Sequence, residues 1–294
     1  MASIHQPPAQ PVVRAFPTID ALKEALASFI INAQKEVFEK KGRPRFTIAL
    51  SGGSLPDMLS GLIGKADVKW KHWYTPAIYT CFFGAHFQAD RHVFYADERI
   101  VPLDHPDSNH RLTMAKLFAK DPNNVIPAVM HSLDPDLLEK LKGVSDPEEV
   151  AKIHEDLTDA YETELIREFA QKDAARFPVF DLILLGIGPD GHTASLFPSH
   201  ALLAEGDRWV GYINDSPKPP PCRITFTLPV LNHAARVVFV AAGQDKADVL
   251  HTVIDKPEVG LPASRVRPVS PGQLYFYLNE PAAAKIQSHR SVNQ

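Results

Sequence analysis

The sequence has 294 residues, and its 31 basic and 35 acidic side chains give a formal charge of −4 at pH 7. Hydrophobic residues make up 45% and charged residues 22%, which is the ordinary composition of a folded globular protein. The mild negative charge argues against a dedicated nucleic-acid binder and against a polybasic membrane-surface protein.

In chain order, residues 1–15 are rich in proline and are expected to form a disordered tail. A helix follows with Thr18 as its N-cap, because apolar residues recur behind it at helical spacing, and Gly42 is suited to its end. Residues 46–50 read as a short buried strand. A glycine-rich turn then leads into a helix that opens at Pro56, since proline is tolerated in a first turn.

The same order of strand, loop and helix recurs along the chain. We expect strands over 92–96, 179–185, 209–213, 223–227 and 236–242, helices over 108–118 and 146–171, and a helix from Gly243 through Leu250. Residues 273–278 alternate less cleanly, which indicates an edge strand.

Near-continuous apolar strands that alternate with helices are typical of a largely parallel sheet covered on both faces. The sequence therefore predicts an α/β fold in one compact domain over residues 16–282, followed by a tail over 283–294. In such sheets the ligand binds outside the carboxyl ends of the strands.

Two cysteines, Cys81 and Cys222, are too few for a disulfide framework or a cysteine-rich zinc site. No apolar run approaches the roughly 18 residues of a transmembrane helix. The N-terminus lacks the apolar region of a secretory signal. We therefore expect a cytoplasmic protein.

The residues Ser51, Gly52, Gly53 and Ser54 lie between the first buried strand and its helix. Glycines bring backbone N–H groups close to an anion, and a helix N-terminus adds partial positive charge. The turn is either a phosphate site or a tight connection that needs glycine for geometry, and the motif alone leaves both open. It lacks the lysine of a Walker A loop, which disfavours a nucleoside triphosphate.

The charged run Asp97, Glu98 and Arg99 follows the strand over 92–96 directly. It places acidic and basic groups at the ligand-binding edge of the sheet. Taken alone, however, such a run is more typical of a solvated loop with a surface ion pair.

Residues 186–191 read GIGPDG and match the dinucleotide-binding fingerprint as a bare pattern. The match lies late in the chain, and no acid ends a second strand about 20 residues on, so we reject an NAD-dependent oxidoreductase. What remains is a flexible turn that presents Asp190 and His192. A neutral imidazole accepts a proton from water near pH 7, and its place on this loop favours a catalytic role.

Three cations follow in two further loops. Prolines hold the loop over 214–223 extended, so Lys218 and Arg223 have little entropy left to lose on binding phosphate. A solvated loop with surface charge is an equal interpretation. Lys246 lies in the first turn of a helix, where a cation opposes the helix dipole, and this weakly indicates an anionic partner.

In this order the strings SGGS, ADER, GIGPDGHTASLFP, DSPKPPPCRIT and GQDK resemble the 6-phosphogluconolactonases, within the glucosamine-6-phosphate isomerase/deaminase-like superfamily. The resemblance covers residues 16–282, and within the family the chain resembles the eukaryotic branch. It implies a NagB/RpiA-like three-layer α/β/α fold with a mostly parallel, doubly wound sheet of Rossmann-like topology. It also implies hydrolysis of 6-phospho-D-glucono-1,5-lactone to 6-phospho-D-gluconate in the oxidative pentose phosphate pathway, with no metal and no organic cofactor.

Residue by residue, the resemblance implies that His192 is the general base that activates water. Asp190 would orient His192 or hold a sugar hydroxyl, and Arg99 with Asp97 would face the lactone and its developing negative charge. The implied phosphate-binding set is Ser51, Gly52, Gly53, Ser54, Lys218, Arg223 and Lys246. Which of these three cations touches the phosphate stays open.

Residues 74–90 depart from the family pattern, which passes into the following strand with fewer residues. The segment is apolar and aromatic and contains Cys81. It is either a surface insertion, a partner-binding patch, or retained intron sequence from gene prediction. We favour the last of these.

Two alternative functions are carried forward. An amino-sugar-phosphate isomerase or deaminase would have a glutamate five residues after the loop histidine, where this chain has Phe197. A non-catalytic sugar-phosphate sensor would lack the base, whereas His192 is present. For partners we expect a small sugar-phosphate lactone, neither nucleic acid nor a membrane, and a monomer or weak homodimer.

Overall fold

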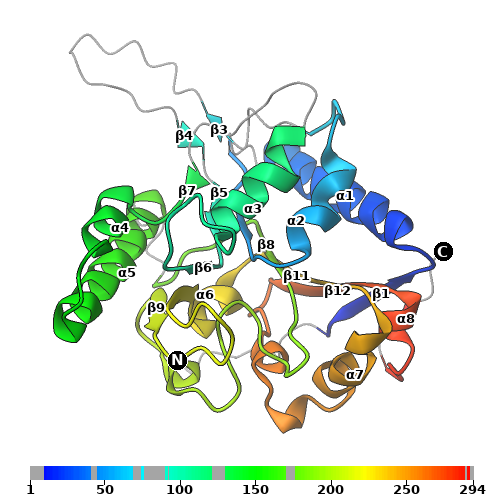
Figure 1. Cartoon of the computed structure of the whole chain (residues 1–294). Coiled ribbons are helices and arrows are strands. Elements are labelled where there is room, and N and C mark those ends of the chain that lie inside the picture. Colours follow the sequence, from blue (N-terminus) through cyan, green and yellow to red (C-terminus); the bar gives the residue numbers. More distant parts are fainter. Residues whose placement is uncertain are drawn as a thin grey trace, which may run out of the picture.

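The computed structural model describes residues 10–40, 45–68, 74–75, 90–91, 93–120, 130–169, 176–288 and 290–291. Within this part of the chain, eight strands pair in parallel in the order β13–β1–β12–β11–β8–β2–β5–β7 (Figure 1). These strands are β1 (Val12–Phe16), β2 (Ile48–Leu50), β5 (Val93–Tyr95), β7 (Met130–His131), β8 (Leu182–Leu185), β11 (Arg236–Ala241), β12 (Gln273–Asn279) and β13 (Arg290–Ser291).

Helices cover both faces of this sheet. The α-helices are α1 (Ile19–Lys35), α2 (Leu55–Met58), α3 (Asn109–Lys116), α4 (Pro135–Leu141), α5 (Pro147–Phe169), α6 (Leu228–His233), α7 (Ala247–Asp255) and α8 (Glu280–Ala283). A π-helical turn spans Glu36–Lys40, and 3₁₀ turns span Leu59–Leu62, Phe118–Lys120, Ala201–Ala204, Gln244–Lys246, Pro257–Val259 and Pro262–Arg265.

The alternation of side chains along β8 explains the layers. Leu182 and Leu184 pack into a cluster with α1 and the 3₁₀ turn after α2, whereas Ile183 and Leu185 pack on the other face with α5, α6 and α7. Because successive residues of a strand point to opposite faces, one apolar run fills two cores. The three-layer α/β/α fold with a mostly parallel sheet is thereby confirmed (Figure 1).

The direction in which strands are added reverses at β2. The next strands along the chain, β5 and β7, lie on one side of β2, and the later strands β8, β11 and β12 lie on the other. A crevice between oppositely wound halves is the usual ligand site of such sheets. The loops that follow β2 and β8 therefore meet at this switch point.

A second, antiparallel sheet was not expected from the sequence. It consists of β6 (Asp97–Arg99), β10 (Arg223–Phe226) and β9 (Val210–Ile213) in the order β6–β10–β9. The charged run after β5 thus forms a strand rather than a solvated loop, and it joins the large sheet where the Phe226 N–H donates to the Ala96 carbonyl at 2.7 Å.

The predicted tails over residues 1–15 and 283–294 each include residues that form regular secondary structure. Val12–Phe16 forms β1, which pairs with β12 over five residues, so the proline-rich tail ends earlier than residue 15. At the other end Ala283 closes α8, and Arg290–Ser291 form β13 beside β1. These two strands lie outside β12, so the prediction that residues 273–278 form an edge strand was wrong.

Most of the predicted insertion over residues 74–90 lies outside the described residues, and so does Cys81. At its borders β3 (Tyr74–Thr75) and β4 (Asp90–Arg91) pair in antiparallel fashion. Among the helices of the described residues, none combines the length and the apolar character needed to cross a membrane.

Candidate active site

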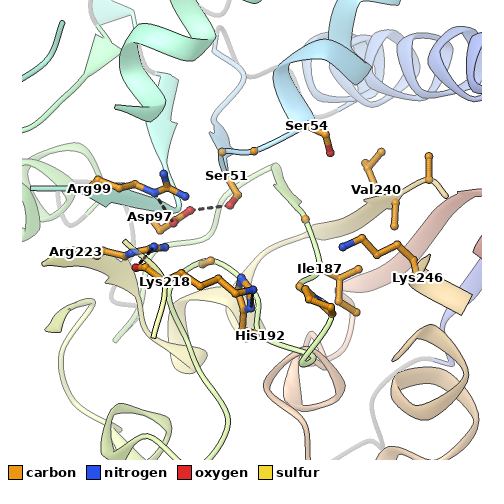
Figure 2. A pocket seen from close by; sticks show the side chains of 18 of the residues that line it. Ser51, Ser54, Asp97, Arg99, Ile187, His192, Lys218, Arg223, Val240 and Lys246 are labelled. Carbon is orange, nitrogen blue, oxygen red and sulfur yellow. Dashed lines mark hydrogen bonds and ion pairs between the residues drawn. The ribbon is translucent and has the colours of Figure 1, made fainter. Parts of the chain in front are cut away.

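A pocket of about 340 Å³ lies where β2, β8 and β11 end, facing the small sheet (Figure 2). Apart from Asp190, every site residue predicted from the sequence lines this pocket. The lining residues are Ser51, Gly52, Gly53, Ser54, Asp97, Arg99, Gly186, Ile187, Gly188, Pro189, His192, Ala194, Lys218, Pro219, Arg223, Val240, Ala241, Ala242 and Lys246. Motifs that are nearly 200 positions apart in the sequence therefore meet in one space.

The turn after β2 depends on its glycines for shape. Gly53 has a φ of +69°, a conformation that side chains other than glycine rarely adopt. A Cβ on Gly52 would lie 1.8 Å from Oδ1 of Asn109, which is itself buried and donates its side-chain N–H to the Asp97 carbonyl at 2.8 Å. The turn thus needs glycine for its shape, as one of the two interpretations of the motif predicted. The same turn also lines the pocket.

Asp97 is buried, with 2% of its surface exposed, and both of its carboxylate oxygens accept hydroxyl groups. Ser51 donates to Oδ1 at 2.7 Å, and Ser195 donates to Oδ2 at 3.0 Å (Figure 2 shows the Ser51 bond). Arg99 lies beside it, with Nε 4.0 Å from Oδ2. The carboxylate therefore joins the loops after β2 and β8 to the small sheet.

Glu98 points away from the pocket and caps α3. Its carboxylate accepts the backbone N–H groups of Arg99, Asn109 and His110, each at 2.8 Å, and the Ser108 hydroxyl at 3.3 Å. Burial nevertheless raises the pKa of Glu98 to about 7, because desolvation outweighs these bonds. The middle residue of the charged run thus anchors the strand that carries its two neighbours.

His192 lies in the loop after β8, with its Nδ1 2.5 Å from Asp190 Oδ1. The Nζ of Lys218 lies 3.3 Å from the same nitrogen. Because the carboxylate is closer, we assign the Nδ1 proton to the bond with Asp190, which leaves the lone pair on Nε2. Asp190 itself does not line the pocket but orients the ring from behind.

Gly188 makes room for this pair. A Cβ on Gly188 would lie 2.0 Å from both Cε1 and Nδ1 of His192. The loop is closed by backbone bonds, since the Gly188 N–H donates to the His192 carbonyl at 2.9 Å and the Gly191 N–H donates to the Gly188 carbonyl at 3.0 Å. Glycine at position 188 therefore makes room for the imidazole of His192.

Burial lowers the pKa of His192, with the hydrogen bond and charge of Asp190 opposing this effect and the charge of Lys218 adding to it. For Asp190, burial acts to raise the pKa, but the hydrogen bond from His192 and the charges of His192 and Lys218 outweigh it and lower the pKa. At neutral pH the imidazole is therefore neutral and Asp190 is ionised, which is the state a general base requires.

Arg223 organises the proline-rich loop. It is 2% exposed, and its guanidinium donates to the carbonyls of Pro220 at 2.9 Å and Lys218 at 2.7 Å. The buried ring of Phe197 lies between this guanidinium, 5.7 Å away, and the His192 ring, 4.7 Å away. Both the base and the loop cation thus rest on one aromatic side chain.

Lys246 approaches from the other side of the pocket. It belongs to the turn between β11 and α7, and its Nζ is 3.7 Å from Asp245. In Figure 2 its amino group points into the pocket from the side of Ser54, whereas Arg99, Lys218 and Arg223 lie on the opposite side. The cations therefore divide between two ends of the pocket.

Sequence reasoning missed four buried contributors: Glu98, Asn109, Ser195 and Phe197. Glu98, Ser195 and Phe197 stand inside motifs that were recognised, so a signal was present but gave no role. Asn109 carries no local signal, because its contact with Gly52 depends on how α3 packs against the turn.

Comparisons with known proteins agree with this geometry. Residues 17–276 match the family described as "Glucosamine-6-phosphate isomerases/6-phosphogluconolactonase". The chain is 37% identical to "Probable 6-phosphogluconolactonase" of Schizosaccharomyces pombe, over 94% of this chain and 96% of that protein. It is 38% identical to "6-phosphogluconolactonase" of Rattus norvegicus, over 94% of each chain.

Among solved structures, the 6-phosphogluconolactonase of Leishmania guyanensis superposes with a TM-score of 0.72 at 26% identity, covering 95% of this chain and all of that one. The pocket, the fold and the match along nearly the whole chain lead to one conclusion. The chain belongs to the glucosamine-6-phosphate isomerase/6-phosphogluconolactonase family.

Proposed function

We propose that this protein hydrolyses 6-phospho-D-glucono-1,5-lactone to 6-phospho-D-gluconate, a step of the oxidative pentose phosphate pathway. The proposal rests on one observation. His192, which is hydrogen-bonded to Asp190, lines the same pocket as Lys246 and the glycine turn over 51–54. The near full-length relatives named 6-phosphogluconolactonase support it.

In the first step, water attacks C1 of the lactone, and Nε2 of His192 takes one of its protons. The carbonyl oxygen becomes an oxyanion in a tetrahedral intermediate, and the bond between C1 and the ring oxygen then breaks. His192 returns its proton to the ring oxygen, so the products are the carboxylate, whose released proton passes to solvent, and the C5 hydroxyl. Asp190 stays ionised throughout and stabilises the imidazolium.

The oxyanion forms beside His192, so we assign Lys218 and Arg99 to its stabilisation. Lys218 is 3.3 Å from the His192 ring, and Arg99 lines the same end of the pocket. A lactone is already an activated ester. Positioned proton transfer of about 10²–10⁴-fold, with about 10²–10³-fold from oxyanion donors, is therefore sufficient without a covalent nucleophile.

The phosphate belongs at the opposite end, with Lys246, Gly52, Gly53 and Ser54. Lys218 lies beside the base, and Nε and Nη2 of Arg223 donate to carbonyls of the proline-rich loop. Lys246 is the cation that remains on the side of the turn (Figure 2). Of the three cations that the sequence offered as phosphate ligands, we therefore assign Lys246.

The isomerase or deaminase alternative is not favoured. The position five residues after His192 holds Phe197, which is 3% exposed and packs on the imidazole ring. An apolar ring there supplies no acid for opening a sugar ring. The sensor alternative does not account for a neutral, oriented imidazole in the pocket.

The test is a lactonase assay, in which the phosphorylated lactone is generated in situ and its loss is followed against spontaneous hydrolysis. His192→Ala should lose about 10²–10⁴-fold in kcat while binding 6-phosphogluconate nearly as the wild type does. Unchanged turnover in this variant would refute the catalytic assignment. Ammonia release from glucosamine-6-phosphate at a comparable rate would refute the function.

Two further expectations belong to the proposal. Composition and charge support a cytoplasmic location. A pocket formed within one chain supports activity as a monomer or weak homodimer. Imaging of the tagged protein and size-exclusion chromatography coupled to light scattering test them.

A further inference from the structure

We propose that Ser195 is a positioning residue, which through the carboxylate of Asp97 fixes the loop of His192 at a set span from the turn over 51–54. The inference rests on the proposed lactonase function and deepens it, because it concerns the distance between the base and the phosphate end. Turnover depends on this span, because the base must reach C1 of a lactone whose phosphate is held at the other end, whereas the binding of a product or a small anion depends on it much less.

Ser195 meets the small sheet at two points, three residues after His192. Its hydroxyl donates to Asp97 Oδ2 at 3.0 Å, and its backbone N–H donates to Thr225 Oγ1 at 3.2 Å. Thr225 of β10 and Asp97 of β6 are directly opposite each other in the small sheet, so both contacts of Ser195 are made with one pair of facing residues. Ser195 has no exposed surface, and it therefore acts through these bonds rather than by touching a ligand.

Ser51 makes the matching contact from the other loop. Its hydroxyl donates to Asp97 Oδ1 at 2.7 Å, and its backbone N–H donates to the Leu184 carbonyl of β8 at 3.0 Å. One buried carboxylate thus holds a hydroxyl from each of the loops that follow the adjacent strands β2 and β8. Because both hydroxyls bond to one buried side chain, this link resists separation of the two loops.

The effect on catalysis follows from geometry. Removing the Ser195 hydroxyl breaks one of the two bonds between this segment and the small sheet, leaving the backbone bond to Thr225, and it leaves the Asp190 contact with His192 intact. A displacement of about 1 Å at a reacting group costs up to about 10²-fold in rate. The glycine turn keeps its own contacts with Asn109 and β8, so a small anion at that end is unaffected.

The experiment compares wild type with Ser195→Ala. We expect kcat/KM for the lactone to fall by about 10- to 100-fold through kcat, and the affinities for 6-phosphogluconate and for inorganic phosphate to change by less than about twofold. Isothermal titration calorimetry measures both affinities. Thr158→Val is the matched control, since it removes a buried hydroxyl on α5 that donates to the His154 carbonyl, remote from the pocket.

A lower melting temperature with unchanged kcat/KM would make Ser195 merely stabilising and overturn the inference. An equal loss of phosphate and product affinity would overturn it too, because the span would not be the cause. If Ser195→Ala does not fold, Ser195→Cys retains a weaker donor and should show a smaller loss of kcat/KM, again with little change in the two affinities. Failure of the proposed function appears in the wild-type assay, whereas failure of this inference appears in the variants alone.

Discussion

At the scale of single residues, two opposite charges act on the imidazole of His192. The Asp190 carboxylate accepts a hydrogen bond from Nδ1–H, and its negative charge favours the protonated ring, while the Lys218 ammonium at 3.3 Å favours the neutral ring. Burial sets the overall direction, and the pKa of His192 lies below its ordinary value. Variants at the two charged positions should therefore move the activity profile in opposite directions.

In Asp190→Asn, the influence that raises the pKa of His192 is lost, so the acid limb of kcat/KM should move to lower pH. In Lys218→Gln, the influence that lowers this pKa is lost, and the acid limb should move to higher pH. Profiles of kcat/KM between about pH 4.5 and 8, corrected for spontaneous hydrolysis, measure both shifts. Movement of both limbs in the same direction would contradict the assigned charges.

Gly188→Ala should damage catalysis more than stability. The added Cβ would stand 2.0 Å from two ring atoms of His192, so the imidazole must leave its place against Asp190. We expect kcat to fall by about 10²-fold with the product still bound. Gly206→Ala is the control, because a Cβ there meets nothing within 4 Å. Equal kinetics for the two variants would show that Gly188 does not shape the site.

The residue types of the site were predictable from sequence, but their division of labour was not. Five ordered motifs and the family resemblance that they carry were enough to name ten of the residues that line the pocket. Nothing local indicates that Glu98 points away while its neighbours Asp97 and Arg99 face in. That difference arises because alternate residues of β6 face opposite sides, and β6 becomes a strand by pairing with β10, more than 120 positions later.

At the scale of elements, Glu98 couples β6 to the N-terminus of α3. Its pKa of about 7 lies above the value of 4.5 for an unperturbed glutamate, so the folded state holds its proton more tightly than the unfolded state. The unfolding free energy relative to Glu98→Gln should thus decrease by up to ~3 kcal/mol as pH rises from about 4.5 to about 7, and stay constant above.

Denaturant unfolding of both proteins at several pH values measures this dependence. Glu149→Gln, at an exposed glutamate in the first turn of α5, provides the control. A constant difference between wild type and Glu98→Gln across the range would show that burial does not govern this carboxylate.

Long, strongly periodic elements were predicted well, and short ones were not. The Thr18 N-cap is confirmed by its bond with the Ala21 N–H at 3.1 Å, and α5 lies within two residues of its predicted ends. The strand β1 was missed because prolines lie close to it and the burial of its five residues alternates only in part. Its partner β12 is about 260 positions away, and such pairing leaves no local mark.

At the scale of the whole molecule, the pocket lies between the large and the small sheet, which are joined by the backbone bonds of Ala96 to Leu50 and Phe226. A ligand held by Lys246 on one side and Arg99 on the other would bridge them. We expect 6-phosphogluconate at about 100 times its Kd to add ~2.7 kcal/mol to stability and to raise Tm by about 5 °C. Gluconate without phosphate, at equal concentration, should raise Tm less, and equal shifts would contradict binding of the phosphate. Differential scanning calorimetry measures both.

The register of the small sheet has a practical consequence for anyone who handles this protein. Arg99 and Arg223 are directly opposite each other on β6 and β10, and the Arg99 charge, after burial, contributes to a lowered pKa of Arg223. Facing like charges repel each other, and the charges of Asp97 and Asp107, which act to raise the pKa of Arg223, oppose this repulsion. Citrate or sulfate from a storage buffer would further reduce that repulsion and compete with the sugar lactone for the pocket. The rate of lactone hydrolysis measured in such salts would be lower than the true rate. Exchange into an amine buffer with chloride should restore the full rate.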